Sequence, residues 1–293
     1  MTTPPRPLAI DHISAGADAF HNEDMIAVFE HDGVTDIVVL DGATSVAEHN
    51  YIDAAAGDVV WFVRQFCRRL EPLLHRERSQ ADSVKAALAD LRRAFVERTG
   101  GGDVPLHAWP IAAMSWLRIV ATGPALALQA YCVGDCKTLL YREGSGVVDL
   151  DPYVNPQEGI LLAEIERLTQ AGVDATARKA HLLPMLRARR EQQNTMVAPA
   201  ILCLDPRGDL AARTFALALG PGDVVLGMTD GFYRIVDPYR LQSAGAMARR
   251  CITEGVAAVL ADLRHFEADR QRADSGAVKR ADDASAVVCK VLG

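Results

Sequence analysis

An Asp-Gly pair, Asp32-Gly33, separates two apolar runs, MIAVFE and TDIVVL, near the start of the chain. Asp-Gly flanked by apolar strands is the strongest short-range signal of a β-hairpin with a two-residue turn. Such a turn fixes the strand register, which pairs Val28 with Ile37 and Ile26 with Val39. Because both faces of this hairpin are apolar, we expect a sheet that is covered on both sides, in a layered sandwich.

The same register places Asp24 directly opposite Asp41, at the open end of the hairpin. Directly opposed residues have Cβ atoms about 5 Å apart, and like charges at that distance repel each other. A cation between the two carboxylates would remove the repulsion. The pair therefore points to a bound ion.

Further aspartates stand where an apolar strand meets a turn: Asp135 after QAYCVG, Asp230 after DVVLGMT, and Asp282 or Asp283 before ASAVV. Each one alone is explained by the preference of Asp and Gly for turns. Together with Asp24 and Asp41 they predict an oxygen-only site for Mg²⁺ or Mn²⁺, which prefer carboxylate, carbonyl and water ligands. Gly42, next to Asp41, would let the backbone approach closely enough for its carbonyl to become a ligand.

The rest of the chain alternates between strand and helix patterns. Apolar residues recur at helical spacing from Val59 to Leu73 and from Val84 to Phe95, the second run after a capping Ser79. Further strands are expected at PIAAMSWLRIV, ALALQAYCVGD, CKTLLYRE, AILCL, DVVLGMTD and ASAVVCKVL, and further helices across about 239 to 268. No repeat or linker divides the chain, which predicts one domain over residues 1–293.

Residues 151–199 differ in character from their surroundings. This stretch is polar and helix-prone, carries the basic run RKAHLLPMLRARR, and continues into a QQN segment that we expect to be mobile. We interpret it as an insertion into the domain. Its arginines are either a solvated helix face or a positive patch over an anionic substrate.

Composition excludes several classes of protein. A net charge of −7 and a pI near 5.6 argue against nucleic-acid binding. No apolar run approaches the ~20 residues that span a bilayer, and the N-terminus lacks the apolar segment of a signal peptide. We therefore expect no membrane association and a cytoplasmic location. The six cysteines lack zinc-site spacing and are expected to be reduced, buried thiols.

Five short motifs occur in a fixed order: NEDM, VLDGA, VGDCK, MTDGF and DDAS. In this order they resemble the motifs of the PP2C-type (PPM) metal-dependent Ser/Thr protein phosphatases, along nearly the whole chain. The resemblance implies an α+β fold, the PP2C-like α-β-β-α four-layer sandwich, in which helices flank two antiparallel sheets. It also implies a helical flap ahead of the TDG motif, where residues 151–199 lie, and suggests a divergent bacterial-type member that acts in signalling.

The resemblance also implies roles for single residues. Asp41 resembles the carboxylate that bridges two Mn²⁺ or Mg²⁺ ions, with the Gly42 carbonyl as a further ligand. Asp230 and Asp282 would hold one ion, with Asp283 beside them. Glu23 and Asp24 would hold metal-bound water. Asp135, with Asp230, would hold a third and more weakly bound ion that some members of the family contain.

Three positions depart from the family pattern. Ala19 stands where the family usually has a phosphate-binding arginine, Ala43 replaces the histidine of animal members, and IAAMSW, which contains Ser115, replaces a Gly-Thr motif. Another cation could replace the arginine: Arg118, Arg142 and the arginines of the 151–199 insertion are candidates, none of them favoured by the sequence.

The implied activity is that of a protein-serine/threonine phosphatase, which hydrolyses phosphoserine or phosphothreonine in proteins by two-metal activation of a bridging water. Its partner would be a phosphoprotein made by a cognate Ser/Thr kinase. Two alternatives stay open. One is a weak or inactive pseudophosphatase that binds a phospho-ligand or partner, and the other is a small-molecule phosphoesterase.

Overall fold

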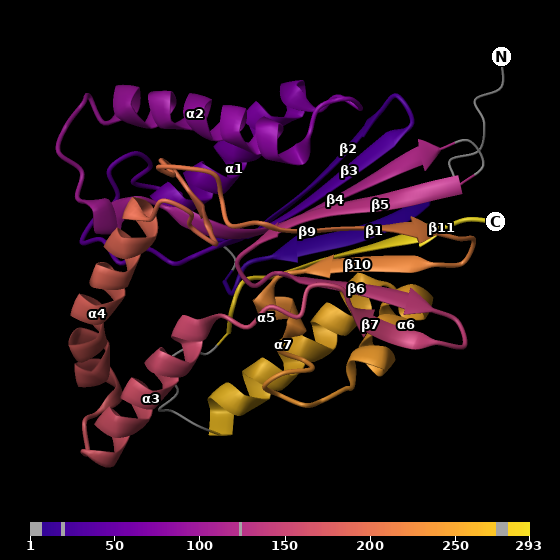
Figure 1. Ribbon diagram of the computed structural model, residues 1–293. Helices are drawn as coiled ribbons and strands as arrows, with labels where there is room; N and C mark the ends of the chain where they lie inside the picture. The colour runs from indigo at the N-terminus through magenta and orange to yellow at the C-terminus, as the bar shows by residue number, and fades with distance from the viewer. Residues whose placement is uncertain (1–7, 19–20, 123–124, 274–280) are drawn as a thin grey trace.

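Two antiparallel β-sheets pack face to face at the centre of the computed structural model, with helices on both outer faces (Figure 1). The structure describes residues 8–18, 21–122, 125–273 and 281–293. The first sheet has the strand order β1 (Leu8–Ala15), β11 (Ala284–Val291), β10 (Val224–Met228), β6 (Lys137–Arg142), β7 (Gly146–Asp149). The second has the order β2 (Met25–His31), β3 (Val34–Gly42), β4 (Ile111–Thr122), β5 (Ala125–Val133), β9 (Arg213–Leu219), and β8 (Leu202–Cys203) also pairs with β4.

The β2–β3 hairpin has the predicted register. Val28 pairs with Ile37 and Ile26 with Val39, and both turn residues have positive φ, 42° at Asp32 and 72° at Gly33. These are the left-handed conformations that a type I′ turn requires. The Gly42 amide donates to the Glu23 carbonyl at 3.2 Å, so the pairing continues past the strand end and keeps Asp24 opposite Asp41.

Three apolar layers hold the four structural layers together. The middle layer lies between the sheets and includes Ile37 and Val39 of β3 with Val225 of β10 and Val287 of β11. The outer layers lie under the two helix pairs, α1 (Asp58–Leu70) with α2 (Gln80–Arg98) and α6 (Ala244–Glu254) with α7 (Val256–Ala273). The four-layer α-β-β-α sandwich is therefore confirmed, and its helices cover both sheets as the two-sided apolar hairpin predicted.

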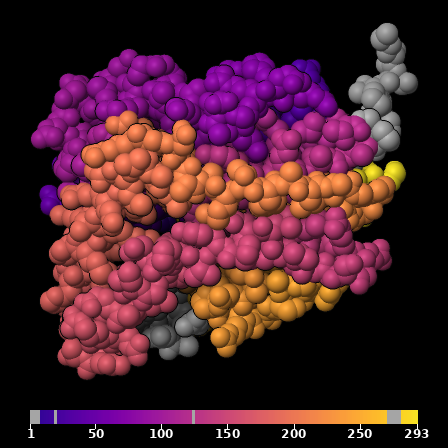
Figure 2. Space-filling view, viewed as in Figure 1, coloured from indigo at the N-terminus to yellow at the C-terminus, as the bar shows by residue number. Residues whose placement is uncertain are grey.

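Two helices occupy the predicted insertion, α3 (Pro156–Gln170) and α4 (Ala175–Thr195). They cross one end of the sandwich, away from the described chain ends (Figures 1 and 2). Each begins at a side-chain cap, Asn155 for α3 and Asp174 for α4. The prediction of a mobile QQN segment is wrong, because Asn194 is buried at the end of α4 and donates to the carbonyls of Leu106 and Trp109.

Some elements differ from the sequence prediction. β7 and β9 were not predicted, and AILCL forms only the two-residue strand β8. Short helices also lie at η1 (Glu71–Leu73), η2 (Leu106–Ala108) and α5 (Asp230–Tyr233). Ser79 caps α2 as predicted, and all six cysteines are free and buried. Among the described helices, none has the length and apolar character needed to cross a bilayer.

Candidate metal centre

The predicted carboxylates meet at one end of the sandwich, where strands of both sheets end. Asp41 lies at the end of β3, Asp230 begins α5 directly after β10, and Asp282 precedes β11. Asp41 lies close enough to four other carboxylates for their charges to raise its pKa: Asp230, Asp24, Asp135 and Asp282. Residues separated by more than two hundred positions in the sequence therefore share one electrostatic environment.

Asp24 lies on the buried wall of this cluster and links the two sheets. Its Oδ2 accepts a hydrogen bond of 2.8 Å from the Thr229 hydroxyl, and that hydroxyl accepts one of 3.0 Å from the Ser285 amide. Thr229 is fully buried between β10 and the start of β11. The side chain that precedes Asp230 thus fixes Asp24 against the opposite sheet.

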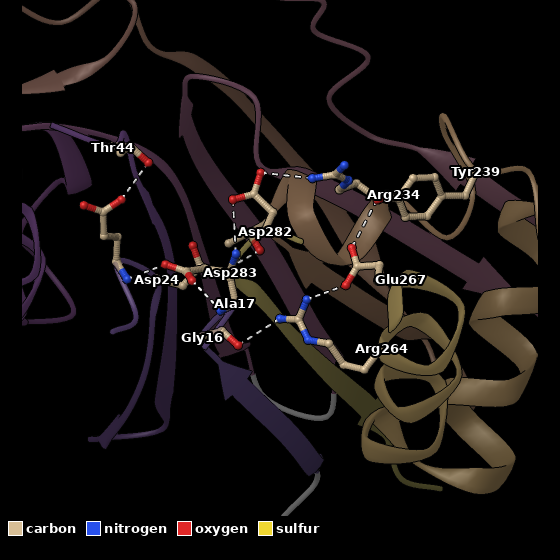
Figure 3. A network of polar contacts seen from close by, with 12 residues as sticks. Gly16, Ala17, Asp24, Thr44, Arg234, Tyr239, Arg264, Glu267, Asp282 and Asp283 are labelled. Carbon is tan, nitrogen blue, oxygen red and sulfur yellow. Dashed lines mark hydrogen bonds and ion pairs between the residues drawn. The ribbon is translucent and has the colours of Figure 1, made fainter. Parts of the chain in front are cut away.

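Asp283 has a structural role beside Asp282. Its two carboxylate oxygens accept from the backbone amides of Ala17, at 2.7 Å, and Glu23, at 2.6 Å (Figure 3). Asp282 faces the guanidinium of Arg234 at 3.4 Å. Asp282 also accepts from the Asp283 backbone amide at 3.1 Å, so both aspartates of the pair have polar partners, and the role of Asp282 as a ligand stays a prediction.

Burial and mutual repulsion make the cluster costly without a counter-charge. Burial raises the pKa of Asp24 to about 8, with smaller contributions from the charges of Asp283 and Asp230. Burial also raises the pKa of Asp41 well above its usual range, and the surrounding carboxylates add to this effect. Within the described residues, neither Asp24 nor Asp41 forms an ion pair with a basic side chain.

Glycine allows close backbone contacts at both Asp-Gly motifs. A Cβ at Gly42 would lie 2.5 Å from Val59 Cγ1 and 2.6 Å from the Glu23 carbonyl oxygen. A Cβ at Gly231 would lie 1.8 Å from the Asp283 carbonyl oxygen. Real Cβ atoms do not approach so closely. The glycine after each aspartate therefore lets neighbouring backbone segments converge on the cluster.

Glu23 lies at the side of the cluster nearest to α4. Its carboxylate accepts from the Thr44 hydroxyl at 2.9 Å. One ligand atom each of His21, Glu23 and Asp283 lies within 4.8 Å of the other two, so His21 lies beside the cluster, a position that no spacing in the sequence indicated. Arg190 of α4 is buried beside Glu23 and donates to the carbonyls of Ala43, at 3.3 Å, and Thr44, at 3.1 Å.

Asp135 connects the cluster to the insertion. Asn155, the cap of α3, donates to Asp135 Oδ2 at 2.9 Å and accepts from the Arg189 guanidinium at 3.1 Å. Sequence patterns did not indicate either partner. The positive charge of the insertion is therefore close to the carboxylates, in line with the interpretation of its arginines as a patch near an anionic substrate.

The structure leaves fewer candidates for a cation that could replace the phosphate-binding arginine expected at Ala19. Arg118 is buried in an ion pair with Asp36, near the opposite end of the β3–β4 ladder from Asp41, and Arg142 pairs with Asp223. Neither contacts the cluster. Ala19 lies outside the described residues. Ser115 is buried and hydrogen-bonded to the Thr138 hydroxyl at 2.6 Å, and no hydrogen bond joins it to the carboxylates among the described residues.

The residues present fit a divalent cation site. All carboxylate donors are hard oxygen ligands, two of them have a pKa raised by burial and by like charges, and the Gly42 backbone is closely packed against Glu23. Cys136 lies under the cluster, and burial followed by the charge of Asp41 raises the pKa of its thiol. A protonated, buried thiol is neither a nucleophile nor a soft ligand.

Neither the known family models nor the curated proteins yield a match to this sequence. Solved structures do match this chain. A serine/threonine phosphatase of S. agalactiae aligns with a TM-score of 0.56 and 15% identity over 97% of this chain and 99% of that one. Stp1 of Staphylococcus aureus aligns with a TM-score of 0.55 and 13% identity, over 98% and 96% of the two chains.

The catalytic domain of the protein phosphatase PstP, solved with two manganese ions, aligns with a TM-score of 0.50 and 16% identity over 98% of this chain and 99% of that one. These alignments cover nearly the whole chain, and the motif order in the sequence predicts the same architecture. The chain has the fold of the PP2C-type serine/threonine phosphatases, at low sequence identity to its structural neighbours.

Proposed function

We propose that the protein is a Mn²⁺- or Mg²⁺-dependent phosphatase that hydrolyses phosphoserine or phosphothreonine in proteins. The convergence of Asp24, Asp41, Asp135, Asp230 and Asp282 at the ends of strands from both sheets carries this proposal. A phosphatase fold supports it, and so does the pair of manganese ions in the PstP neighbour. The substrate would be a protein phosphorylated by a cognate Ser/Thr kinase in the cytoplasm of a bacterium.

Each residue would contribute through its position. Asp41, surrounded by the other carboxylates, would bridge two ions. Asp230 and Asp282 would hold one of them, and the Gly42 carbonyl would be a further ligand. Glu23 and Asp24 would orient water at the buried wall, with Asp24 held by Thr229. When bound, the ions would supply Lewis acidity, a nucleophilic water and charge neutralisation at the phosphoryl oxygens.

The test is an assay with a phosphothreonine peptide and p-nitrophenyl phosphate, with Mn²⁺ and with EDTA. We expect chelation to abolish hydrolysis and Asp41→Asn or Asp230→Asn to lower kcat by at least ~10²-fold, because either change weakens ion binding and the charge stabilisation that depends on it. Asp32→Asn, in the exposed turn of the same hairpin, is the matched control and should retain full activity.

Activity that survives EDTA or either site substitution would contradict the two-metal proposal. Mn²⁺ binding measured by calorimetry, without turnover of either substrate, would instead identify a binding module. Hydrolysis of p-nitrophenyl phosphate and small phosphoesters, but not of phosphopeptides, would identify a small-molecule phosphoesterase.

A further inference from the structure

A small pocket of mixed polar and apolar lining lies between the insertion and Gly134, the residue before Asp135. Its volume is about 160 Å³, which is ample for a phosphoryl group. The Gly134 backbone and the side chain of Ile201 form part of the wall on the sandwich side. The polar side chains that line it are Tyr153, Asn155, Gln157, Arg189, Gln192 and Gln193.

Arg189 is the one arginine that lines this pocket, it is half-buried, and its Nε has no hydrogen-bond partner among the described residues. Its guanidinium donates to Asn155 Oδ1 at 3.1 Å, and its Nε is buried without a hydrogen-bond partner. A guanidinium has five N–H donors, and a buried donor without an acceptor is unfavourable. In the described part of the chain, no carboxylate lies within ion-pair distance of Arg189. An anion in the pocket would satisfy these donors.

The walls of the pocket hold Arg189 in place. Asn155 bridges Arg189 to Asp135, so the guanidinium lies one side chain away from a member of the carboxylate cluster. Tyr153 packs against the guanidinium of Arg213, which in turn forms an ion pair with buried Asp151. The next residue along α4, Arg190, anchors the helix to the carbonyls of Ala43 and Thr44. The arginine is thus presented to the cluster by a fixed helix.

We infer that Arg189 binds the phosphoryl group of the substrate, in place of the arginine that the family carries where this chain has Ala19. A guanidinium binds phosphate oxygens with two parallel charge-assisted hydrogen bonds, which a neutral Asn or Gln cannot replace. The inference rests on the proposed function, since it names the substrate-recognition group of the same site. It makes Arg189 a substrate-binding residue that the insertion supplies.

The experiment compares wild-type protein with Arg189→Met and Arg189→Lys, in Mn²⁺, on a phosphothreonine peptide and on p-nitrophenyl phosphate. We expect Arg189→Met to raise KM for both substrates by about 10- to 100-fold, the range for loss of a charge-assisted hydrogen bond, and to leave the Mn²⁺ concentration for half-maximal activity unchanged. Arg189→Lys keeps the positive charge but lacks the planar guanidinium, so its KM should lie between those of wild type and Arg189→Met. Lys179→Met, an exposed position of α4, is the matched control.

A second readout does not depend on turnover. Calorimetric titration of inorganic phosphate into the Mn²⁺-loaded protein should give a Kd about 10-fold or more higher for Arg189→Met than for wild type. If wild type binds phosphate in this way but hydrolyses neither substrate, the proposed function fails while the inference stands.

Three results would overturn the inference while leaving a metal-dependent phosphatase intact. Unchanged phosphate affinity in Arg189→Met is the first. A KM increase for the peptide alone would show that the pocket binds another part of the peptide. Loss of activity that extra Mn²⁺ restores, with KM unchanged, would show that Arg189 only balances the charge of Asp135.

Discussion

Asp24 shows at the scale of one residue how a cation would stabilise the proposed site. Its carboxyl is 6% exposed and accepts a hydrogen bond from Thr229, yet burial raises its pKa to about 8. The hydrogen bond lowers the pKa but does not offset the burial. A carboxylate in this position is therefore ionised at neutral pH only if an external positive charge favours the ionised form.

This raised pKa predicts how the stability of the metal-free protein depends on pH. Between about pH 4 and about pH 8, the folded state keeps a proton on Asp24 that the unfolded chain has released. The free energy of unfolding must then fall as pH rises through this window, because the folded state binds more protons. We expect Tm in EDTA to be lower at pH 8 than at pH 5 by at least about 4 °C, which is about 2–3 kcal/mol for a chain of 293 residues.

Two controls belong to that measurement. Asp24→Asn, which cannot ionise, should reduce the pH dependence and leave the part that the raised pKa of Asp41 contributes, and Mn²⁺ at pH 8 should restore the Tm because it binds only the folded state. A Tm in EDTA that is constant or rises from pH 5 to pH 8 would show that burial does not raise the Asp24 pKa.

Helix α4 shows at the scale of an element how the insertion is attached to the site. Arg187 donates to the Val46 carbonyl at 2.9 Å, Arg190 to the carbonyls of Ala43 and Thr44, and Asn194 to those of Leu106 and Trp109. The donors are spaced by three and four residues, so they lie on one face of the helix. Through Arg187 and Arg190, this face holds residues 43–46, which directly follow Asp41 and Gly42.

We predict that Arg190→Met loosens this segment more than it affects the rest of the fold. Arg190 is buried, and its removal leaves two carbonyls without their donor, at a cost of about 1–3 kcal/mol. Hydrogen–deuterium exchange should increase across residues 43–48, with a weaker apparent affinity for Mn²⁺. Lys179→Met on the same helix should change neither, and unaltered exchange at 43–48 in Arg190→Met would refute the anchoring role.

The sequence predicted α4 as a helix but could not predict its docking. Its polar composition was consistent with a solvated face, and its partners are backbone carbonyls, which any residue type provides. The role of Asn155 as both helix cap and partner of Asp135 was hidden for another reason: the two side chains are 20 residues apart, and no local pattern links them. In contrast, the β2–β3 register followed from the local turn chemistry of Asp32-Gly33 and is confirmed.

At the scale of the whole molecule, local sequence patterns predict the sandwich, but the grouping of the carboxylates depends on how the two sheets are connected and packed. β9 was missed although Phe215, Leu217 and Leu219 alternate with smaller or polar residues, the usual signal of a half-buried strand. Asp24 and Asp41 could be paired from the hairpin alone. Bringing Asp230 and Asp282 to them depends on the packing of one sheet on the other, which only the order of the family motifs suggested.

The central claim is that carboxylates from both sheets form one divalent cation site. Crystals grown with Mn²⁺ and measured at the manganese absorption edge test it most directly. We predict two anomalous peaks about 3.5–4 Å apart, both contacted by Asp41 and flanked by Asp24, Asp230 and Asp282. A map of fully soaked crystals with no peak at Asp41, or with peaks only elsewhere on the protein, would contradict the account.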